Sequence, residues 1–112
     1  MNITITIPKS EKDNWVNDIE QLKNKNVKLH FKIPFLLKNT KKGDKCFVII
    51  DNKIIGYHTI DDIGFKDEFI CSTTKKHWPA GYYITRSSNS WNKLNNPIES
   101  KSHRGVHYTK LG

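Results

Sequence analysis

The side chains best suited to bind a ligand are clustered in one short segment of the second half of the chain. Residues 75–82 read Lys-Lys-His-Trp-Pro-Ala-Gly-Tyr and so bring ammonium groups, an imidazole, an indole and a phenol close together. A flat ring beside positive charge suits a nucleobase and its phosphate, because stacking contributes about 1–3 kcal/mol per base. The predicted ring surfaces are Trp78, His77 and Tyr82, and the predicted phosphate contacts are Lys75 and Lys76. The alternative is that the Trp78-Pro79 pair plugs the end of a barrel.

Two further aromatic residues are candidates for the same site. Trp91 lies in a polar stretch, residues 87–96, which has too few apolar side chains for a core of its own. An indole among Ser and Asn either folds back onto the sheet as a lid or stacks on a ligand. Tyr57 precedes His58 in a predicted strand, and this pair can present a polar edge at a barrel mouth. The alternative for His58 is an ordinary packing role.

Arginine is scarce in this basic chain. Of its 19 lysines and arginines, only Arg86 and Arg104 are arginine. A guanidinium makes planar, bidentate contacts with phosphate, base or carboxylate, so both residues are candidate phosphate ligands. The alternative is an ion pair with one of three acidic residues, which are Asp61, Asp62 and Glu99. The loop at residues 38–45 adds further lysines, which are either phosphate contacts or merely solvated. Its candidate phosphate contacts are Lys41 and Lys42.

The sequence offers little for metal binding or covalent catalysis. His103 and His107 have a spacing that can ligate zinc on a helix. Gly105 and the β-like residues after it predict a strand instead, which would separate the two imidazoles by about 13 Å at ~3.3 Å per residue. We therefore predict no metal site. No Ser or Cys lies in a nucleophile motif, so we predict no catalytic residue and no cofactor, and we leave enzymatic activity open.

Composition favours a polyanion as partner. The chain of 112 residues carries a formal net charge of +8, which favours nucleic acid over a membrane, although Lys, Asn and Ile also accumulate in A/T-rich genomes. No apolar run approaches the ~20 residues of a membrane span, and the first residues lack the features of a signal peptide. We expect a cytoplasmic protein. Cys46 and Cys71 then suit a role as reduced core residues, although the sequence does not exclude a disulfide.

The elements that must position these residues are mainly strands. Two β-branched runs around Asp51-Asn52-Lys53 predict a hairpin over residues 42–60, apolar on both faces and therefore central. Gly56 in its second arm predicts a bulge or a close backbone approach. An acidic connection is expected at residues 61–68. The remaining predicted strands cover residues 2–7, 27–33, 69–73, 82–86 and 105–110.

One amphipathic helix is predicted over residues 11–24. Ser10 is its expected N-cap, and Trp15 is expected to anchor its apolar stripe in the core. The chain is thus predicted to form one domain, residues 1–112, of α+β class and mostly β. Many strands with turn signals about every ten residues favour a small barrel of six or seven strands with an appended helix.

The order of these motifs resembles the PUA-like superfamily, near its ASCH and EVE branches. The resemblance rests on the Lys-Gly-Asp turn into the hairpin, the Ile-Ile-Gly-Tyr-His second arm, the Trp-Pro-Ala-Gly-Tyr-Tyr-Ile segment and the closing Arg-Gly-Val-His-Tyr. It covers most of residues 42–108. It implies a PUA-like pseudo-barrel that binds RNA or DNA and holds one modified or flipped base in an aromatic pocket.

The resemblance also implies an enzymatic alternative. One ASCH branch deacetylates an acetylated cytidine and has a Lys, then a Thr, on the strand after the first helix, and a later Glu. Here Lys25 or Lys28 could serve as that lysine and Glu68 as the acid, but no Thr follows at the matching place. The leading hypothesis is therefore a nucleic-acid-binding module. A hydrolase of a modified nucleoside and a bacterial or phage protein-binding factor are the alternatives.

Overall fold

The computed structural model describes residues 1–70 and 75–112 and confirms a fold of α+β class that is mostly β. Its strands are β1 (Asn2–Thr6), β2 (Lys28–Ile33), β3 (Lys45–Ile50), β4 (Lys53–Lys66), β5 (Phe69–Ile70), β6 (His77–Trp78), β7 (Gly81–Ser87), β8 (Asn92–Glu99) and β9 (Val106–Thr109). The helical segments are the 3₁₀ turns η1 (Lys9–Glu11) and η2 (Ser88–Ser90) and the helix α1 (Lys12–Lys23). The described residues form nine strands, seven of which make up the main sheet, in agreement with the six or seven strands that the sequence predicted.

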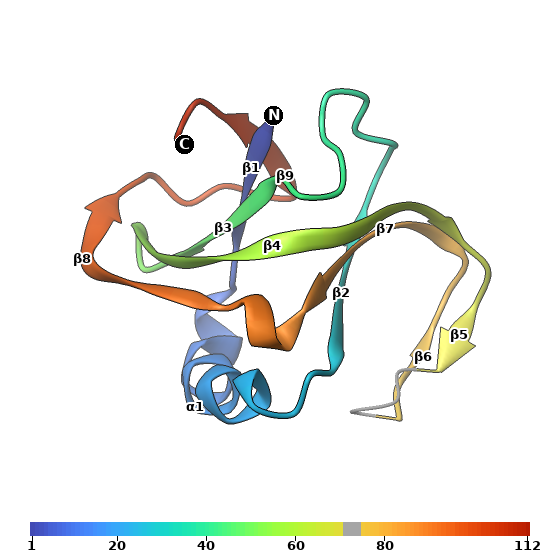
Figure 1. Ribbon diagram of the computed structural model, residues 1–112, viewed down its shortest axis with the longest axis horizontal. Helices are drawn as coiled ribbons and strands as arrows, with labels where there is room; N and C mark the ends of the chain where they lie inside the picture. The colour runs from blue at the N-terminus through green and yellow to red at the C-terminus, as the bar shows by residue number, and fades with distance from the viewer. Residues whose placement is uncertain (71–74) are drawn as a thin grey trace.

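Seven of these strands form one curved sheet in the order β2-β7-β4-β3-β1-β9, with β8 paired to β4 beside that path (Figure 1). β1 lies between β3, to which it is parallel, and β9, to which it is antiparallel. Thr4 is buried together with Ile3 and Ile5, although strict alternation predicted a strand with one exposed face. The ring of His103, which shares a hydrogen bond with Thr4 Oγ1, lies on the Thr4 side of the strand. β5 and β6 form a separate two-stranded sheet, and the rest of the predicted strand at residues 69–73 lies outside the described residues.

The predicted hairpin is present as β3 and β4. Its turn has positive φ at Asp51 (51°) and Asn52 (60°), a conformation that these two residue types tolerate. β4 does not stop at Ile60 but runs to Lys66, so the acidic connection expected at residues 61–68 was wrong. The register of β4 against β7 shifts between Ile60 and Asp62, and this irregularity lets the strand continue through its acidic pair.

Gly56 allows the second arm of the hairpin to meet its neighbours closely. A Cβ at this position would lie 2.5 Å from Cη2 of Trp91 and 2.6 Å from the carbonyl oxygen of Asn92. The register of β4 against β8 also shifts between Ile54 and Gly56. The sequence predicted a bulge or a close approach here, and the structure has both features.

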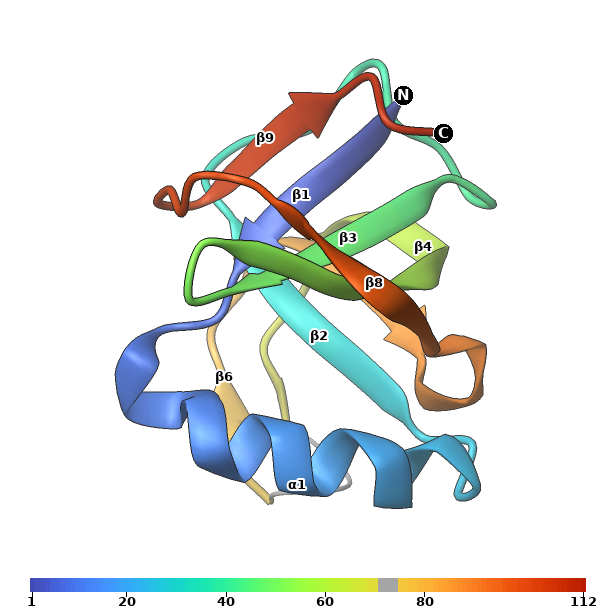
Figure 2. The ribbon, with the colours of Figure 1, turned by 90° about the vertical axis from the view of Figure 1, so that its left-hand side faces the viewer.

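Helix α1 crosses one end of the sheet (Figure 2). It buries Ile19, while Trp15 is only half-buried. Ser10 was expected to cap the helix, but it lies within η1, and the helix begins after Glu11 without a side-chain cap. The early 3₁₀ turn displaces the N-terminus of the helix by one residue, so the Ser10 hydroxyl is not in the capping position.

The polar stretch at residues 87–96 was expected to be a loop. It forms η2 and the first part of β8, which pairs with β4. β8 exposes seven of its eight residues, because it lies off the main strand path and packs little of its surface. Pairing of this strand therefore rests on backbone hydrogen bonds, which its polar sequence does not reveal.

Two remaining expectations concern the cysteines and the membrane. Cys46 is a buried free thiol on β3, as expected for a small core residue. Cys71 lies outside the described residues. Within the described part of the chain, no helix has the length and apolar character needed to cross a membrane.

Candidate nucleic-acid interface

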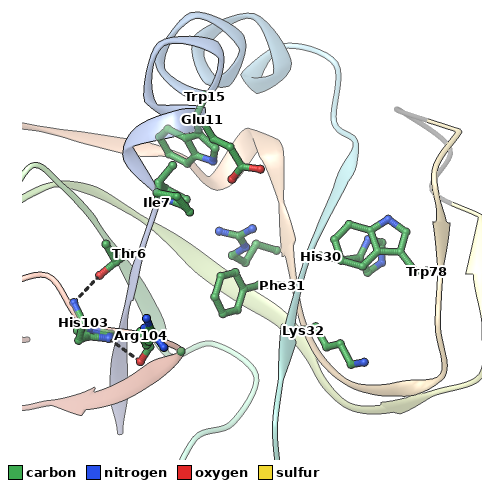
Figure 3. A pocket seen from close by; sticks show the side chains of 13 residues that line it. Thr6, Ile7, Glu11, Trp15, His30, Phe31, Lys32, Trp78, His103 and Arg104 are labelled. Atoms are coloured by element: carbon green, nitrogen blue, oxygen red, sulfur yellow. Dashed lines mark hydrogen bonds between the residues drawn. The ribbon is translucent and has the colours of Figure 1, made fainter.

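A cavity of about 640 Å³ opens between the two ends of the main sheet (Figure 3). Three parts of the chain build its wall: the segment from the end of β1 into α1, the strand β2 with its neighbours, and the turn that precedes β9. The lining residues are Thr6, Ile7, Pro8, Glu11, Trp15, His30, Phe31, Lys32, Trp78, Arg86, His103, Arg104 and Gly105.

The strand order explains why the cavity is there. β2 and β9 are the two end strands of the sheet and are not paired with each other in the described structure. Because β2 is an edge strand, the cavity reaches both of its faces: Phe31 lies on the face that packs on the main core, and His30 lies on the other face. The curved sheet is thus open between its two end strands, and the cavity lies at this opening.

Arg86 is the most unusual residue of this cavity. Only 4% of its surface is exposed, and its Nε and Nη1 atoms have no hydrogen-bond partner among the described residues. Alternation along β7 places it on the same face as Ile84, and Ile60 is its neighbour on β4. Burial lowers the pKa of Arg86, but a guanidinium in a protein remains protonated. The wall of the cavity therefore holds a buried positive charge.

The neighbours of Arg86 do not neutralise it. The Cys46 thiol interacts with the guanidinium, and burial raises the pKa of this thiol so that it is neutral at pH 7. His58 is fully buried, and burial, with Arg86, lowers its pKa from 6.5 to about 2, so it is also neutral. Both ring nitrogens of His58 lack a partner within the described residues.

The ion pairs proposed for Arg86 and Arg104 are not formed. Asp61 pairs with Nζ of Lys28 at 2.6 Å, and Asp62 lies 3.8 Å from Nζ of Lys66. In the part of the chain that is described, neither arginine lies within 4.0 Å of a carboxylate oxygen. Arg104 is exposed at the rim of the cavity. Both arginines are therefore available to a ligand.

Trp78 is half-buried and contributes a ring to the cavity wall. It stacks in parallel on Phe69 at 6.2 Å, and Nζ of Lys76 lies 5.2 Å from its ring centre. Its Nε1 atom and Nδ1 of His30 are buried without a hydrogen-bond partner among the described residues. The Trp-Pro segment thus leaves part of the indole accessible and does not plug the sheet.

Trp15 is a lining residue that the sequence assigned to the core. It packs edge-on against Trp91 at 5.2 Å, and its other side faces the cavity together with Glu11 (Figure 3). Its place in an apolar helical stripe is the same for a core residue and for a cavity residue, so periodicity could not separate the two roles. Phe31 was also assigned to the buried face of its strand, because only the strand order shows that β2 borders the opening.

Trp91 folds back onto the sheet, as in the lid alternative, and does not line the cavity. It is 3% exposed, contacts His58 at 4.9 Å between ring centres, and donates its indole N–H to Glu20 at 3.1 Å. A ring enclosed in this way is not accessible to a base. The stacking role expected of Trp91 is therefore corrected to a packing role.

Other predicted ligand residues lie away from the cavity. Tyr57 accepts a hydrogen bond from Asn92 at 2.9 Å, and Tyr82 packs edge-on against Phe65 at 5.7 Å. His77 lies 3.3 Å from a carboxylate oxygen of Glu68 and is exposed. The predicted lysines are all exposed and do not line the cavity: Lys41, Lys42, Lys75 and Lys76.

The two histidines near the C-terminus lie much closer than predicted. Their rings stack at 3.8 Å between centres, because His103 precedes β9 and Gly105 (φ +66°) turns the chain back. Nε2 of His103 shares a hydrogen bond with Thr4 Oγ1 at 2.7 Å. The expected separation of about 13 Å was therefore wrong. Within the described residues, no group of three or more His, Cys, Asp or Glu side chains could hold a metal ion.

The residues considered for hydrolysis are not brought together. Lys28 is engaged with Asp61 and Ser87, and Lys25 is exposed. Glu68 faces His77 in the β5–β6 region. None of these residues lines the cavity, so the described geometry offers the hydrolase alternative no assembled site.

Comparisons with known proteins add no family to this description. No family model matches the chain, and no curated protein and no solved structure is significantly similar to it. The PUA-like resemblance therefore remains a prediction from sequence motifs.

Proposed function

We propose that this protein is a nucleic-acid-binding module that receives one base or nucleotide in the cavity between β2 and the β1–β9 end of the sheet. The observation that carries the proposal is the combination of ring walls with positive charge. Trp15, Phe31 and Trp78 supply apolar ring surface, and the lining also contains Arg86, Arg104 and Lys32 against a single carboxylate, that of Glu11.

The dimensions of the cavity agree with this ligand. Small-molecule sites are commonly about 300–1,000 Å³, and 640 Å³ lies well within that range. An unstacked base needs a flat ring surface, and aromatic side chains supply it for any base. The net charge of +8 adds attraction for the phosphate backbone over longer distances.

The test is direct binding of fluorescent RNA and DNA oligonucleotides at two salt concentrations. We expect affinity that falls as salt rises, because phosphate contacts release counterions. Trp78→Ala should weaken binding about 5- to 150-fold, which corresponds to the loss of one stacked base. His77→Ala is the matched control, since His77 is the neighbouring residue but does not line the cavity. Absence of binding at low salt, or equal losses in both variants, would contradict the proposal.

A further inference from the structure

The buried guanidinium of Arg86 has no negatively charged partner in the inner part of the cavity among the described residues. Arg86 is 96% enclosed, lines the cavity, and leaves Nε and Nη1 without partners among the described residues. Burial of a charge is costly unless it is paired and hydrogen-bonded, so native proteins rarely leave such a group unmatched. The most economical explanation is that the missing partner is a ligand group.

The side chains that pack around Arg86 cannot supply that partner. Cys46 and His58 lie on the strands that carry the same interior face, and both are neutral at pH 7. Phe31 and Trp15 are apolar walls of the cavity. The only carboxylate in the lining is Glu11, which points toward the cavity from η1 but makes no ion pair with Arg86 (Figure 3).

The remaining polar atoms of the cavity also favour an acceptor-rich ligand. The indole N–H of Trp78 is donor-only and is unpaired within the described residues. Arg104 and Lys32 add positive charge at the rim. A neutral base edge could accept hydrogen bonds, but it would leave the charge of Arg86 uncompensated, whereas an oxyanion satisfies both requirements.

We infer that the inner part of this cavity binds an oxyanion, a phosphate monoester or a carboxylate, against Arg86. For a nucleic-acid ligand the oxyanion is a terminal phosphate, and this specification rests on the proposed function. The oxyanion site itself does not, because a free phosphorylated or carboxylated small molecule would present the same group. In either case the aromatic rings would hold the part of the ligand that carries the anion.

Titration of the protein with inorganic phosphate, acetate, adenosine 5′-monophosphate and adenosine, followed by NMR chemical shifts, tests the oxyanion site. We expect adenosine 5′-monophosphate to bind about tenfold or more tightly than adenosine, because only the nucleotide pairs with a charged donor. Arg86→Lys should lose most of that preference, since an ammonium keeps the charge without the planar fork. Glu11→Gln should raise phosphate affinity about threefold, because it removes the one carboxylate of the lining.

Two further variants keep the test informative if Arg86→Lys does not fold. Arg86→Met removes a buried charge and is expected to fold, since such replacements are often neutral or stabilising. Its folding is checked by circular dichroism, and Glu11→Gln changes an exposed residue, so it reports on the site even if both Arg86 variants fail. If the wild-type protein binds none of the anions, or if Arg86→Lys and Arg86→Met retain full affinity for them, the inference is wrong.

Oligonucleotides that differ only at their ends separate this inference from the proposed function. A 5′-phosphorylated, a 3′-phosphorylated and a hydroxyl-ended oligonucleotide of one sequence are compared with the wild-type protein and Arg86→Lys. A preference for one phosphorylated end that is lost in Arg86→Lys supports the terminal phosphate as ligand. Equal binding of all three overturns that specification. Binding of adenosine 5′-monophosphate without binding of any oligonucleotide overturns the proposed function and leaves the oxyanion site supported.

Discussion

Two regions of this molecule use the same residue types in opposite ways. On the β4–β8 side, Trp91 is enclosed against Gly56 and gives its indole N–H to Glu20. At the opening between β2 and β1, Trp78 remains half-exposed, and its indole N–H has no partner among the described residues. In the packed region, defined here by Gly56 and Trp91, the indole donor of Trp91 is satisfied by Glu20. In the cavity, the buried donors of Trp78 and Arg86 have no such partner among the described residues.

The comparison shows that hydrogen bonding of the buried polar atoms separates a packing residue from a cavity residue better than the exposed fraction does. Arg86 is almost as enclosed as Trp91, at 4% and 3% exposure, yet only Trp91 has its donor satisfied. Unsatisfied buried donors are uncommon in native structures because each costs free energy. Arg86, Trp78 and His30 carry such atoms in the lining of one cavity, which makes that cavity a candidate site, although His58 and Thr85 carry others outside it.

The largest expected contrast is between the two tryptophans. Trp91→Ala should lower the free energy of unfolding by about 3–5 kcal/mol, because it leaves a large void in a well-packed region. Trp78→Ala should lower it by about 1 kcal/mol or less, because this ring is already partly solvated. Urea denaturation measures both values. Similar losses in the two variants would remove the distinction between packed region and cavity.

The glycine beside Trp91 gives a second contrast. Gly56→Ala should cost about 2–3 kcal/mol, since its Cβ would lie 2.5 Å from the Trp91 ring and 2.6 Å from a backbone oxygen. Gly81→Ala is the control, because its Cβ would meet the flexible Lys32 side chain at 3.1 Å and the Tyr83 ring at an ordinary contact distance of 4.0 Å. The change in melting temperature should be small for Gly81→Ala and large for Gly56→Ala. A large shift in the control would mean that the whole strand β7 tolerates no added volume.

His58 makes the stability of the packed region dependent on pH. Burial, with Arg86, lowers its pKa from 6.5 to about 2 in the folded protein. The unfolded chain therefore takes up a proton below pH 6.5 while the folded protein does not, so stability is full above that pH and decreases as the pH falls. At pH 5 the loss from this residue is about 2 kcal/mol.

His58→Leu should reduce the difference in the free energy of unfolding between pH 5 and pH 7.5, measured by urea denaturation. The variant removes the titrating group and keeps an apolar side chain in a fully buried position. A profile with the same slope as that of the wild-type protein would show that other groups cause the acid sensitivity.

The smallest expected effects concern the phosphate contacts. Arg104 and Lys32 line the cavity, whereas Lys41 and Lys42 lie near the opposite end of β1, where Met1 contacts Asn39. Arg104→Gln and Lys32→Gln should each reduce the slope of log affinity against log salt by about 1. The Lys41→Gln, Lys42→Gln double variant should change it less. Affinities are measured by fluorescence anisotropy. A larger change of slope in the Lys41→Gln, Lys42→Gln double variant than in the cavity variants would mean that the proposed phosphate contacts lie away from the cavity.

Local patterns allowed the hairpin to be predicted and made Arg86 conspicuous. Asp51 and Asn52 form the turn because both tolerate positive φ, and their positions are visible in the sequence. Alternation from Ile84 places Arg86 on the core-facing side of its strand, which is an unusual position for a guanidinium. The hairpin prediction succeeded because the turn depends on neighbours only a few residues away, whereas the burial of Arg86 was not predicted from the sequence.

The features that the sequence missed depend on residues far apart along the chain. The roles of Trp15 and His30 follow from the opening between β2 and β9, which is a property of the strand order. The close approach of His103 and His107 depends on the conformation of Gly105. β8 was missed because its polar side chains are exposed and its pairing with β4 is made by the backbone.

The place of β1 between β3 and β9 has a consequence for the order of folding. Ile3 pairs with Cys46 on one side and with Tyr108 on the other, so the pairing of β1 with β9 closes a loop of almost the whole chain. Contacts between such distant residues slow folding, because the entropy of closing long loops is lost before the pairing forms. The same late-joining segments carry Thr6 and Arg104, two residues of the cavity wall. A ligand bound in the cavity would therefore hold the two chain ends together, and the melting temperature would keep rising with the logarithm of ligand concentration after the site is saturated.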